Sequence, residues 1–195
     1  MRIVVALTGA SGQIYGIRLL EYLSKTDVET HLIISPPAKE NIEIETDYSL
    51  DYVESLADFC YDHMDFTAPI ASGSFKHDGM VVIPCSIKTA SAIANSFSYN
   101  LIIRAADVTL KERRKLVLVV RETPLHSGHL RMLTQLSDLG AIVFPPVPAF
   151  YSKPKTIDDI VNHTVGRVLD LLGIENDLYK PWMGKESISE REFSL

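Results

Sequence analysis

Short runs of consecutive apolar residues alternate with stretches in which apolar residues recur every three or four positions. The short runs are typical of strands that are buried on both faces of a parallel sheet. They predict strands at residues 3–7, 30–34, 80–83, 116–120 and 141–144. The recurring positions are typical of helices that bury one face. They predict helices at residues 14–23, 50–60, 89–95, 100–113, 130–139 and 157–172.

Polar and glycine-containing segments separate these elements. Gly140 and Gly173 each follow the end of a predicted helix, where glycine is a common terminator. Residues 65–78 contain Pro69, Gly73 and several serines, so we expect a loop there. Residues 174–195 are polar, and we expect a C-terminal tail that packs near the active site or a neighbouring subunit. The whole chain, residues 1–195, is long enough for one domain with a large core.

Strands that alternate with helices predict an α/β fold in which helices cover both faces of a parallel sheet. The expected architecture is a three-layer sandwich of the Rossmann-like or flavodoxin-like kind. Such folds bind ligands in a crevice at the carboxyl ends of the strands. Polar segments marked by glycine or proline follow the predicted strands at residues 8–12, 35, 84–89, 121–124 and 148–151. The sequence therefore predicts a ligand site at this edge of the sheet.

Composition and charge narrow the function classes. The chain is 46% hydrophobic and 23% charged, as soluble globular proteins are, and no apolar run reaches the length of a membrane span. Its net charge of −6 argues against non-specific binding to nucleic acid or to an anionic membrane. The two cysteines, Cys60 and Cys85, do not form a disulfide framework, and we expect a cytoplasmic protein. The pair His126 and His129 lacks a nearby third ligand, so no metal site is expected.

The turn at residues 8–12, Thr-Gly-Ala-Ser-Gly, joins the first strand to the first helix. Its glycines let the backbone approach a ligand, and a helix N-terminus favours an anion. A tight turn capped by Ser11 is the alternative. The turn also resembles that of atypical short-chain reductases, which makes a nicotinamide-dependent oxidoreductase a competing interpretation. Against it, Pro154 interrupts the Tyr151 to Lys155 spacing that such an enzyme would carry on a helix.

A second candidate anion site begins at Arg121, which ends a predicted strand. Arginine binds phosphate or carboxylate through two parallel hydrogen bonds. The basic residues at 111–115 are either a phosphate site or an ordinary solvated helix end. Ser86 and Thr89 either cap the helix that follows or bind a ligand. Arg167 lies among apolar residues of the last helix, where a charge needs an acidic partner or a phosphate.

Taken together, these motifs resemble the flavin prenyltransferases of the UbiX type. The resembling segments are residues 8–12, 34–35, 45–47, 84–89, 104–108, 110–114, 116–124, 148–151 and 167–173. They follow the order of the family from residue 1 to about residue 183. Each motif is weak by itself, whereas the whole ordered set is specific.

The resemblance implies an enzyme that joins the dimethylallyl group of dimethylallyl phosphate to N5 and C6 of reduced FMN without a metal ion. The product, prenylated FMN, would serve a partner decarboxylase of the UbiD type. The resemblance further implies a homo-oligomer, a dodecamer, with active sites at subunit junctions. Whether pyrophosphate donors are also accepted stays open.

The resemblance also assigns site residues, position by position. The FMN-binding set is Gly9, Ala10, Ser11, Ser35, Ser86, Ile87, Lys88, Thr89 and Arg121. The set around the prenyl phosphate is Arg104, Lys111, Arg121, Glu122, Tyr151 and Arg167. The catalytic set is Ser11, Glu45, Lys111, Glu122 and Trp182. Within it, Ser11 and Glu45 would handle protons, and the ring of Trp182 would shelter an allyl cation.

Two other flavin interpretations remain. Flavoproteins that oxidatively decarboxylate cysteine-containing substrates resemble this chain in fold, but they use an early catalytic histidine and a Pro-Ala-Met-Asn-type motif. The corresponding stretch here is Arg-Glu-Thr-Pro at residues 121–124, and His31 lies within a strand. A non-catalytic flavin carrier would not need the cationic residues Lys111, Arg121 and Arg167.

Overall fold

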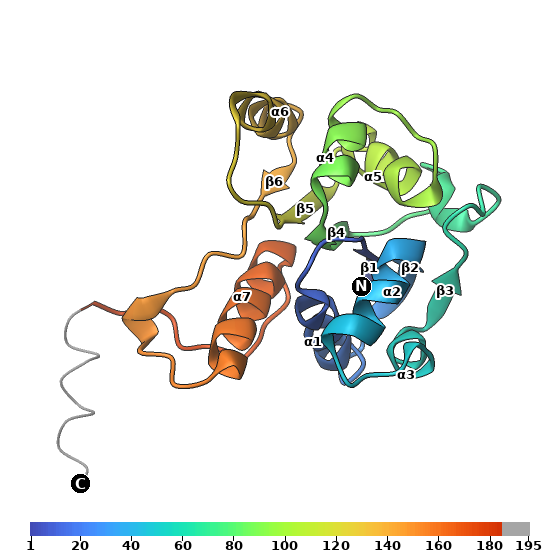
Figure 1. Ribbon diagram of the computed structural model, residues 1–195. Helices are drawn as coiled ribbons and strands as arrows, with labels where there is room; N and C mark the ends of the chain where they lie inside the picture. Colours follow the sequence, from blue (N-terminus) through green and yellow to red (C-terminus); the bar gives the residue numbers. More distant parts are fainter. Residues whose placement is uncertain (185–195) are drawn as a thin grey trace, which may run out of the picture. The chain divides into compact units, whose positions relative to one another are not determined.

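The computed structural model describes residues 1–184 of the chain, and these residues belong to two compact units (Figure 1). The first unit comprises Met1–Pro146, and the second begins at Val147. The expectation of a single domain over residues 1–195 stays a prediction. Residues 185–195 of this expected domain lie outside the described residues.

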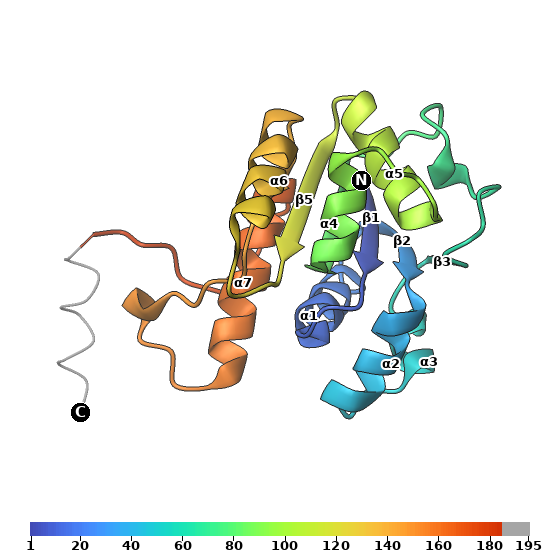
Figure 2. The same cartoon turned by 45° about the horizontal axis from the view of Figure 1, so that its top comes forward.

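The first unit is built on a six-stranded parallel sheet. The strand order is β3-β2-β1-β4-β5-β6, and Figure 2 shows β5, β1, β2 and β3 following one another across the sheet. The strands are β1 (Arg2–Leu7), β2 (Glu29–Ile34), β3 (Phe59–Tyr61), β4 (Gly79–Cys85), β5 (Lys115–Val120) and β6 (Ile142–Val143). All five predicted strands are therefore confirmed.

Helices lie on both faces of this sheet. Alternate residues of each strand point to opposite sides, and strands β1, β4 and β5 are buried at nearly every position, so both faces of the sheet are covered. The helices of the first unit are α1 (Gln13–Leu23), α2 (Pro36–Glu45), α3 (Leu50–Ser55), α4 (Ile87–Ala94), α5 (Leu101–Lys111) and α6 (Ser127–Asp138). One strand face, which includes Val4, Val82 and Leu118, packs with α4 and α5 into a buried core. Helix α1 contacts β1 and β4, and Figure 1 shows it across the sheet from α4 and α5. The predicted α/β three-layer fold is confirmed.

One helix was not expected from the sequence. Residues 36–45 form α2, a segment with two prolines at its start for which no helix was predicted. The Ser35 hydroxyl caps the helix by accepting from the Ala38 N–H. Prolines at the first helical positions are compatible with this start, because the amide hydrogens there have no partner within the helix. The prolines thus begin a helix and do not mark a loop.

The helix predicted at residues 50–60 is too long. Helix α3 ends at Ser55, and residues 59–61 form the short strand β3 at the edge of the sheet. This strand is largely exposed, so its sequence shows neither a buried apolar run nor clear alternation. Its pairing with β2 depends on residues that are distant in sequence, and a local pattern cannot reveal it.

The strand order creates a crevice between β1 and β4. The order 3-2-1-4-5-6 is the Rossmann order, and without the short edge strand β3 the rest is the flavodoxin order. In both, the connections after β1 and β4 leave the sheet in opposite directions, and ligands bind at that switch point. The segments after β1 and β4 are therefore the first place to look for a site.

The second unit consists of the 3-10 turn η2 (Phe150–Ser152), helix α7 (Ile157–Leu172) and a segment that folds back on α7. Thr156 and Asp159 form a capping box at the start of α7, and Gly173 ends it with a φ of +83°. Helix α7 matches its predicted bounds. Among the helices within residues 1–184, none is both long and apolar enough to cross a membrane.

Candidate active site at the switch point of the sheet

A cavity of about 570 Å³ opens at the carboxyl ends of the strands in the first unit. This volume lies within the range of small-molecule sites, about 300–1,000 Å³. Its walls come from the segments after β1, β2, β4 and β5, as the strand order predicts. The lining includes the whole predicted FMN-binding set and Glu122: Gly9, Ala10, Ser11, Ser35, Ser86, Ile87, Lys88, Thr89, Arg121 and Glu122.

The glycine turn forms one wall and is held tightly. Gly12 has a φ of +103°, a conformation that glycine adopts without strain, and it starts α1. Gly9 lies so close to α2 that an added Cβ would be 2.5 Å from the Pro37 Cβ. Gly12 has no side chain to cap the helix. The cap comes instead from Glu45, whose carboxylate accepts from the Gly12 N–H at 2.8 Å and the Gln13 N–H at 3.0 Å.

This placement of Glu45 changes the expected use of the α1 N-terminus. The sequence indicates a ligand anion at these amide groups, whereas the chain's own carboxylate occupies them. Glu45 ends α2 and does not line the cavity, but it is bonded to the residue next to Ser11, which does. Glu45 and Ser11 are thus neighbours in space, as the resemblance implies.

The start of α4 forms the opposite wall. The Ser86 hydroxyl accepts from the Thr89 N–H at 3.3 Å and contacts the Thr89 hydroxyl at 3.1 Å. Ser86 is therefore the N-cap of α4, whereas Thr89 supplies the N–H that is capped, and both residues line the cavity. The Lys88 ammonium lies 5.9 Å from the centre of the Tyr99 ring. A helix N-terminus beside a lysine favours an anionic ligand group.

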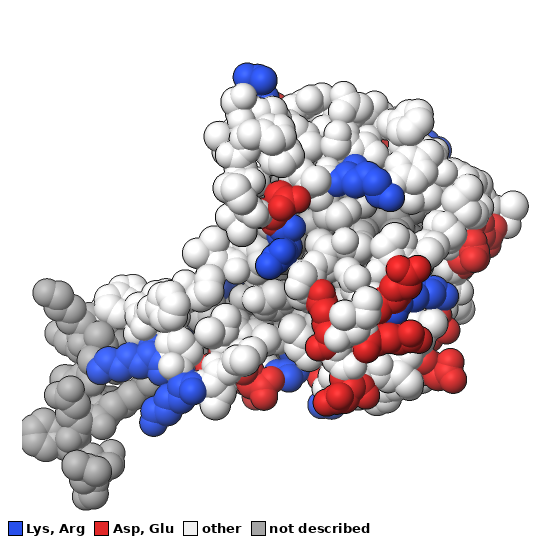
Figure 3. Space-filling model, in the orientation of Figure 1, with Lys and Arg blue, Asp and Glu red and all other residues white. Residues whose placement is uncertain are grey.

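Arg121 and Glu122 complete the cavity at the end of β5. The Arg121 N–H donates to the Cys85 carbonyl, which ties the end of β5 to the end of β4. Lys88 and Arg121 bring two cations to a lining that includes one carboxylate, that of Glu122. The protein as a whole has a net charge of −6. Figure 3 shows acidic side chains gathered over α2 and α3, where Glu40, Glu43 and Asp51 are exposed. The cavity thus combines a local excess of cations with an acidic surface elsewhere.

Two residues of the first unit that were predicted to surround the substrate phosphate, Arg104 and Lys111, do not line this cavity. On α5, the Arg104 Nε donates to the Ala71 carbonyl at 3.0 Å, and Lys111 pairs with Glu112. Nearby, Arg114 donates to the carbonyls of Gly73 and Phe75 at 2.9 and 2.8 Å. At least Arg114 of the basic cluster therefore has a structural role in fixing the loop before β4.

The three predicted residues of the second unit fall into one connected group. The Tyr151 and Trp182 rings meet edge to face at 5.6 Å, and the Tyr151 hydroxyl bonds to the His163 Nε2 at 2.8 Å. The His163 ring contacts the Tyr179 ring, whose hydroxyl accepts from Arg167 at 3.3 Å. Burial, with the charge of Arg167, lowers the pKa of His163. Tyr151 lies in a 3-10 turn and not on a helix, so the tyrosine–lysine pair of a short-chain reductase is absent from this segment.

Several cavity residues were not predicted from the sequence. They are Pro36, Pro37, His63, Tyr99, Asn100 and Ile102. Asn100 could have been found, since it has the character of a helix N-cap, and its side chain does accept from the Ile103 N–H. His63 has no local signal, because it reaches the cavity through a long-range bond from the Leu101 N–H to its carbonyl.

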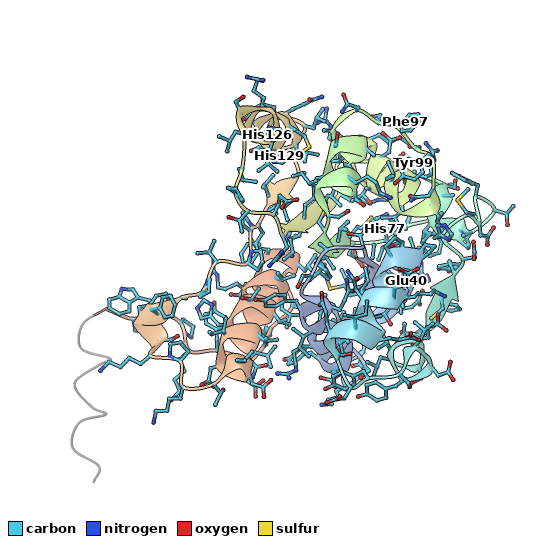
Figure 4. All side chains as sticks on the ribbon, viewed as in Figure 1. Glu40, His77, Phe97, Tyr99, His126 and His129 are labelled. Carbon is cyan, nitrogen blue, oxygen red and sulfur yellow. The ribbon has the colours of Figure 1, made fainter. Side chains whose placement is uncertain are left out.

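Other candidate groups lie outside this site. Cys85 is fully buried, and burial raises the pKa of its thiol to about 12, so it is not an activated nucleophile. Figure 4 places His126 and His129 together at α6, and the His126 Nδ1 caps that helix by accepting two backbone N–H bonds. Within residues 1–184, no group of three or more acidic, histidine or cysteine side chains could hold a metal ion.

The fold and the cavity define an α/β flavoprotein, and residues 1–169 match the model of the Flavoprotein family. The chain is 58% identical over 194 residues to flavin prenyltransferase UbiX of Thauera aromatica. The matched region covers 100% of this chain and 98% of that protein. The chain is 57% identical over 182 residues to flavin prenyltransferase UbiX of Archaeoglobus fulgidus, covering 93% and 100%. The chain therefore belongs to the UbiX family of flavin prenyltransferases.

Solved structures agree with this assignment. The structure of AnUbiX in complex with FMN and dimethylallyl pyrophosphate has a TM-score of 0.92 at 50% identity, covering 94% of this chain and 97% of that one. A dodecameric FMN-dependent UbiX-like decarboxylase from Escherichia coli has the same TM-score and identity, covering 94% and 100%. The peptidyl-cysteine decarboxylase EpiD is 19% identical with a TM-score of 0.61, and this likeness shows a common fold alone.

Proposed function

We propose that this protein joins the dimethylallyl group of dimethylallyl phosphate to N5 and C6 of reduced FMN, forming prenylated FMN. The product would pass to a UbiD-type decarboxylase in the cytoplasm. The observation that carries the proposal is the cavity at the switch point, in which all nine predicted FMN-binding residues meet. Full-length relatives above 50% identity with this activity in their names support it.

The donor set of the cavity suits FMN, which has a flat apolar ring system and an anionic phosphate. The start of α4, with Ser86, Lys88 and Thr89, offers amide, hydroxyl and ammonium groups to an anion. Arg121 supplies a guanidinium that can bind a phosphate through two hydrogen bonds. The glycine turn offers a close approach to its backbone, since Gly9 and Ala10 carry little side chain.

The chain's own residues would stabilise charge and move protons. Bound reduced FMN supplies the two atoms that form the new bonds. Arg121 and the other predicted cations, Arg104, Lys111 and Arg167, would hold the negative charge that develops on the departing phosphate. Glu45 is bonded to the N–H of Gly12, the residue next to Ser11, and in this proposal Glu45 and Ser11 would handle the protons of the reaction. Tyr151, Glu122 and Trp182 would orient the prenyl phosphate.

The cations come from separate places on the chain, and this supports an oligomeric enzyme. Arg104 and Lys111 belong to the first unit but do not line its cavity, whereas Arg121 does. We therefore propose a homo-oligomer, a dodecamer as in the UbiX-like relative from Escherichia coli. In it, residues of one subunit would complete the phosphate site of another.

Glu45→Gln separates an enzyme from a flavin carrier. The amide keeps an oxygen for the Gly12 and Gln13 N–H groups, but it cannot exchange a proton. We expect the dissociation constant for FMN to change less than threefold or so, whereas formation of prenylated FMN falls about 10²-fold or more. Fluorescence titration measures the first quantity and mass spectrometry of released flavin the second. Unchanged turnover in Glu45→Gln would remove Glu45 from the mechanism.

A further inference from the structure

The hydroxyl of Thr8 bridges β1 and β4 beyond the last regularly paired positions of the two strands. That pairing reaches Ala6 and Val82. Two residues later, the Thr8 Oγ1 donates to the Pro84 carbonyl at 2.8 Å and accepts from the Ser86 N–H at 2.8 Å. The Thr8 N–H also donates to the Pro84 carbonyl, at 3.2 Å. Thr8 is 1% exposed, so these bonds hold the two strand ends together inside the protein, where the crevice begins.

Gln13 closes the glycine turn from behind. Its side-chain amide donates to the carbonyls of Thr8 and Ala10, at 2.8 Å each, and the residue is fully buried. Its Oε1 is buried without a hydrogen-bond partner in the part of the chain that the structure describes. A buried amide oxygen without a partner is unfavourable, and the two bonds that the Gln13 amide donates offset this cost. Both bonds go to carbonyls of the glycine turn, so the Gln13 side chain fixes the conformation of that turn.

Thr8 and Gln13 together link the two walls of the cavity, yet neither lines it. Through Ala10 they fix the glycine turn, and through Ser86 they fix the start of α4. A ligand that contacts both walls is bound productively only when the walls keep the right separation, and errors of about 1 Å reduce rates strongly. We propose that Thr8 and Gln13 are positioning residues that clamp the two flavin-binding walls together, a role that rests on the proposed function.

Thr8→Val tests the clamp with nearly the same side-chain volume. The substitution removes the donor to the Pro84 carbonyl and the acceptor from the Ser86 N–H, so the side-chain cross-link is lost while the main-chain bond from Thr8 to Pro84 stays. We expect the dissociation constant for FMN to rise about tenfold, the equivalent of one hydrogen bond of ordinary strength. We also expect kcat at saturating FMN to fall about tenfold. Thr8→Ser keeps the hydroxyl, and it should recover most of both quantities.

Gln13→Leu tests the second half of the clamp. Leucine removes the amide bonds to Thr8 and Ala10 together with the unpaired Oε1. We expect the dissociation constant for FMN to increase about threefold or more and kcat at saturating FMN to fall. A residue with a purely structural role would lower the melting temperature and leave FMN binding and kcat unchanged.

Thr30→Val is the matched control. The Thr30 hydroxyl is also buried, and it also donates one hydrogen bond and accepts one, both with Asp58. Thr30 lies near the amino end of β2, whereas the cavity lies at the carboxyl ends of the strands. We expect Thr30→Val to lower the melting temperature and to leave FMN binding and kcat unchanged.

FMN titration and turnover distinguish the possible failures. If the wild-type protein binds FMN but forms no prenylated product, the proposed function fails, and the titrations still decide the clamp. If wild-type protein is active and both Thr8→Val and Gln13→Leu bind FMN and turn over like it, the clamp is wrong. If Thr30→Val loses FMN affinity as strongly as Thr8→Val, the effect is general destabilisation and the clamp is also wrong.

Discussion

Burial decides the chemistry of several single residues in this protein. His77 is almost fully buried, and its Nδ1 contacts the Gly79 carbonyl at 3.2 Å (Figure 4). Burial, with a smaller contribution from the charge of Arg114, lowers the pKa of His77 below its ordinary value of 6.5. The folded protein therefore holds a neutral imidazole at pH values where the unfolded chain binds a proton.

This difference makes the stability of the fold depend on pH. The contribution of neutral His77 is fully present above about pH 6.5 and is lost as the pH falls from there toward the lowered pKa. We expect a loss of at most about 1.4 kcal/mol per pH unit in that window. Urea unfolding of wild type and His77→Gln from about pH 7.5 to 5.5 measures it. Parallel pH dependences in the two proteins would contradict this account of His77.

At the residue scale, sequence reasoning found the positions that carry a local signal. The glycine turn, Ser86 and Arg121 stand at strand ends, and strand ends of a parallel sheet meet at one edge. The contacts of Glu45 had no such signal. Its bonds to Gly12 and Gln13 span more than 30 residues of sequence. They also depend on helix α2, which was not predicted because it begins with two prolines.

At the element scale, helix ends show how far side-chain capping fixes the structure. Helix α6 begins at Ser127, three residues before its predicted start, because the His126 Nδ1 accepts from the Gly128 and His129 N–H groups at 3.0 and 3.3 Å. Histidine is not a usual N-cap residue, so its capping of α6 was not predicted from the sequence.

His126→Ala should lower the free energy of unfolding by about 1 kcal/mol, because the first turn of α6 loses its cap. His126→Asn serves as the control, since asparagine caps helices well. Both variants lose the stacking of His126 on His129, so their difference isolates the cap. Urea denaturation at pH 8 gives both values, and equal stabilities would show that the cap contributes nothing.

Buried strands and long amphipathic helices were predictable, whereas short or proline-bearing elements were not. Strands β1, β4 and β5 are apolar because both of their faces are covered, and α7 shows a continuous helical period with caps at both ends. Strand β3 is three residues long and exposed. The free energy that fixes it comes from pairing with β2, which no local pattern records.

At the scale of the whole molecule, the predicted catalytic and phosphate-binding residues do not all lie in one cavity of one unit. Glu45 is bonded to the wall of the cavity, whereas Arg104 lies on α5 against the Ala71 carbonyl. The sequence order alone could not show this division, because both residues belong to motifs of one family. The oligomeric active site that we propose would account for it.

Mixing two inactive variants tests such a site. Glu45→Gln and Arg104→Ala should each form little prenylated FMN. If one subunit supplies Glu45 and a neighbour supplies Arg104, co-expressed mixed oligomers contain some sites with both wild-type residues, and turnover should return in part. The same two variants purified separately and mixed without subunit exchange are the control. No recovery in verified mixed oligomers would place both residues in one subunit's site.

The most direct test of the whole account is mass spectrometry of the flavin released after anaerobic incubation of the protein with reduced FMN and dimethylallyl phosphate. The reaction should contain a chelator and no added metal. We predict a flavin heavier by one C5 prenyl unit, with one phosphate released for each flavin modified. If the wild-type protein binds FMN but the released FMN is unmodified, the prenyltransferase assignment is contradicted. A flavin carrier or a decarboxylase would then be the remaining interpretations.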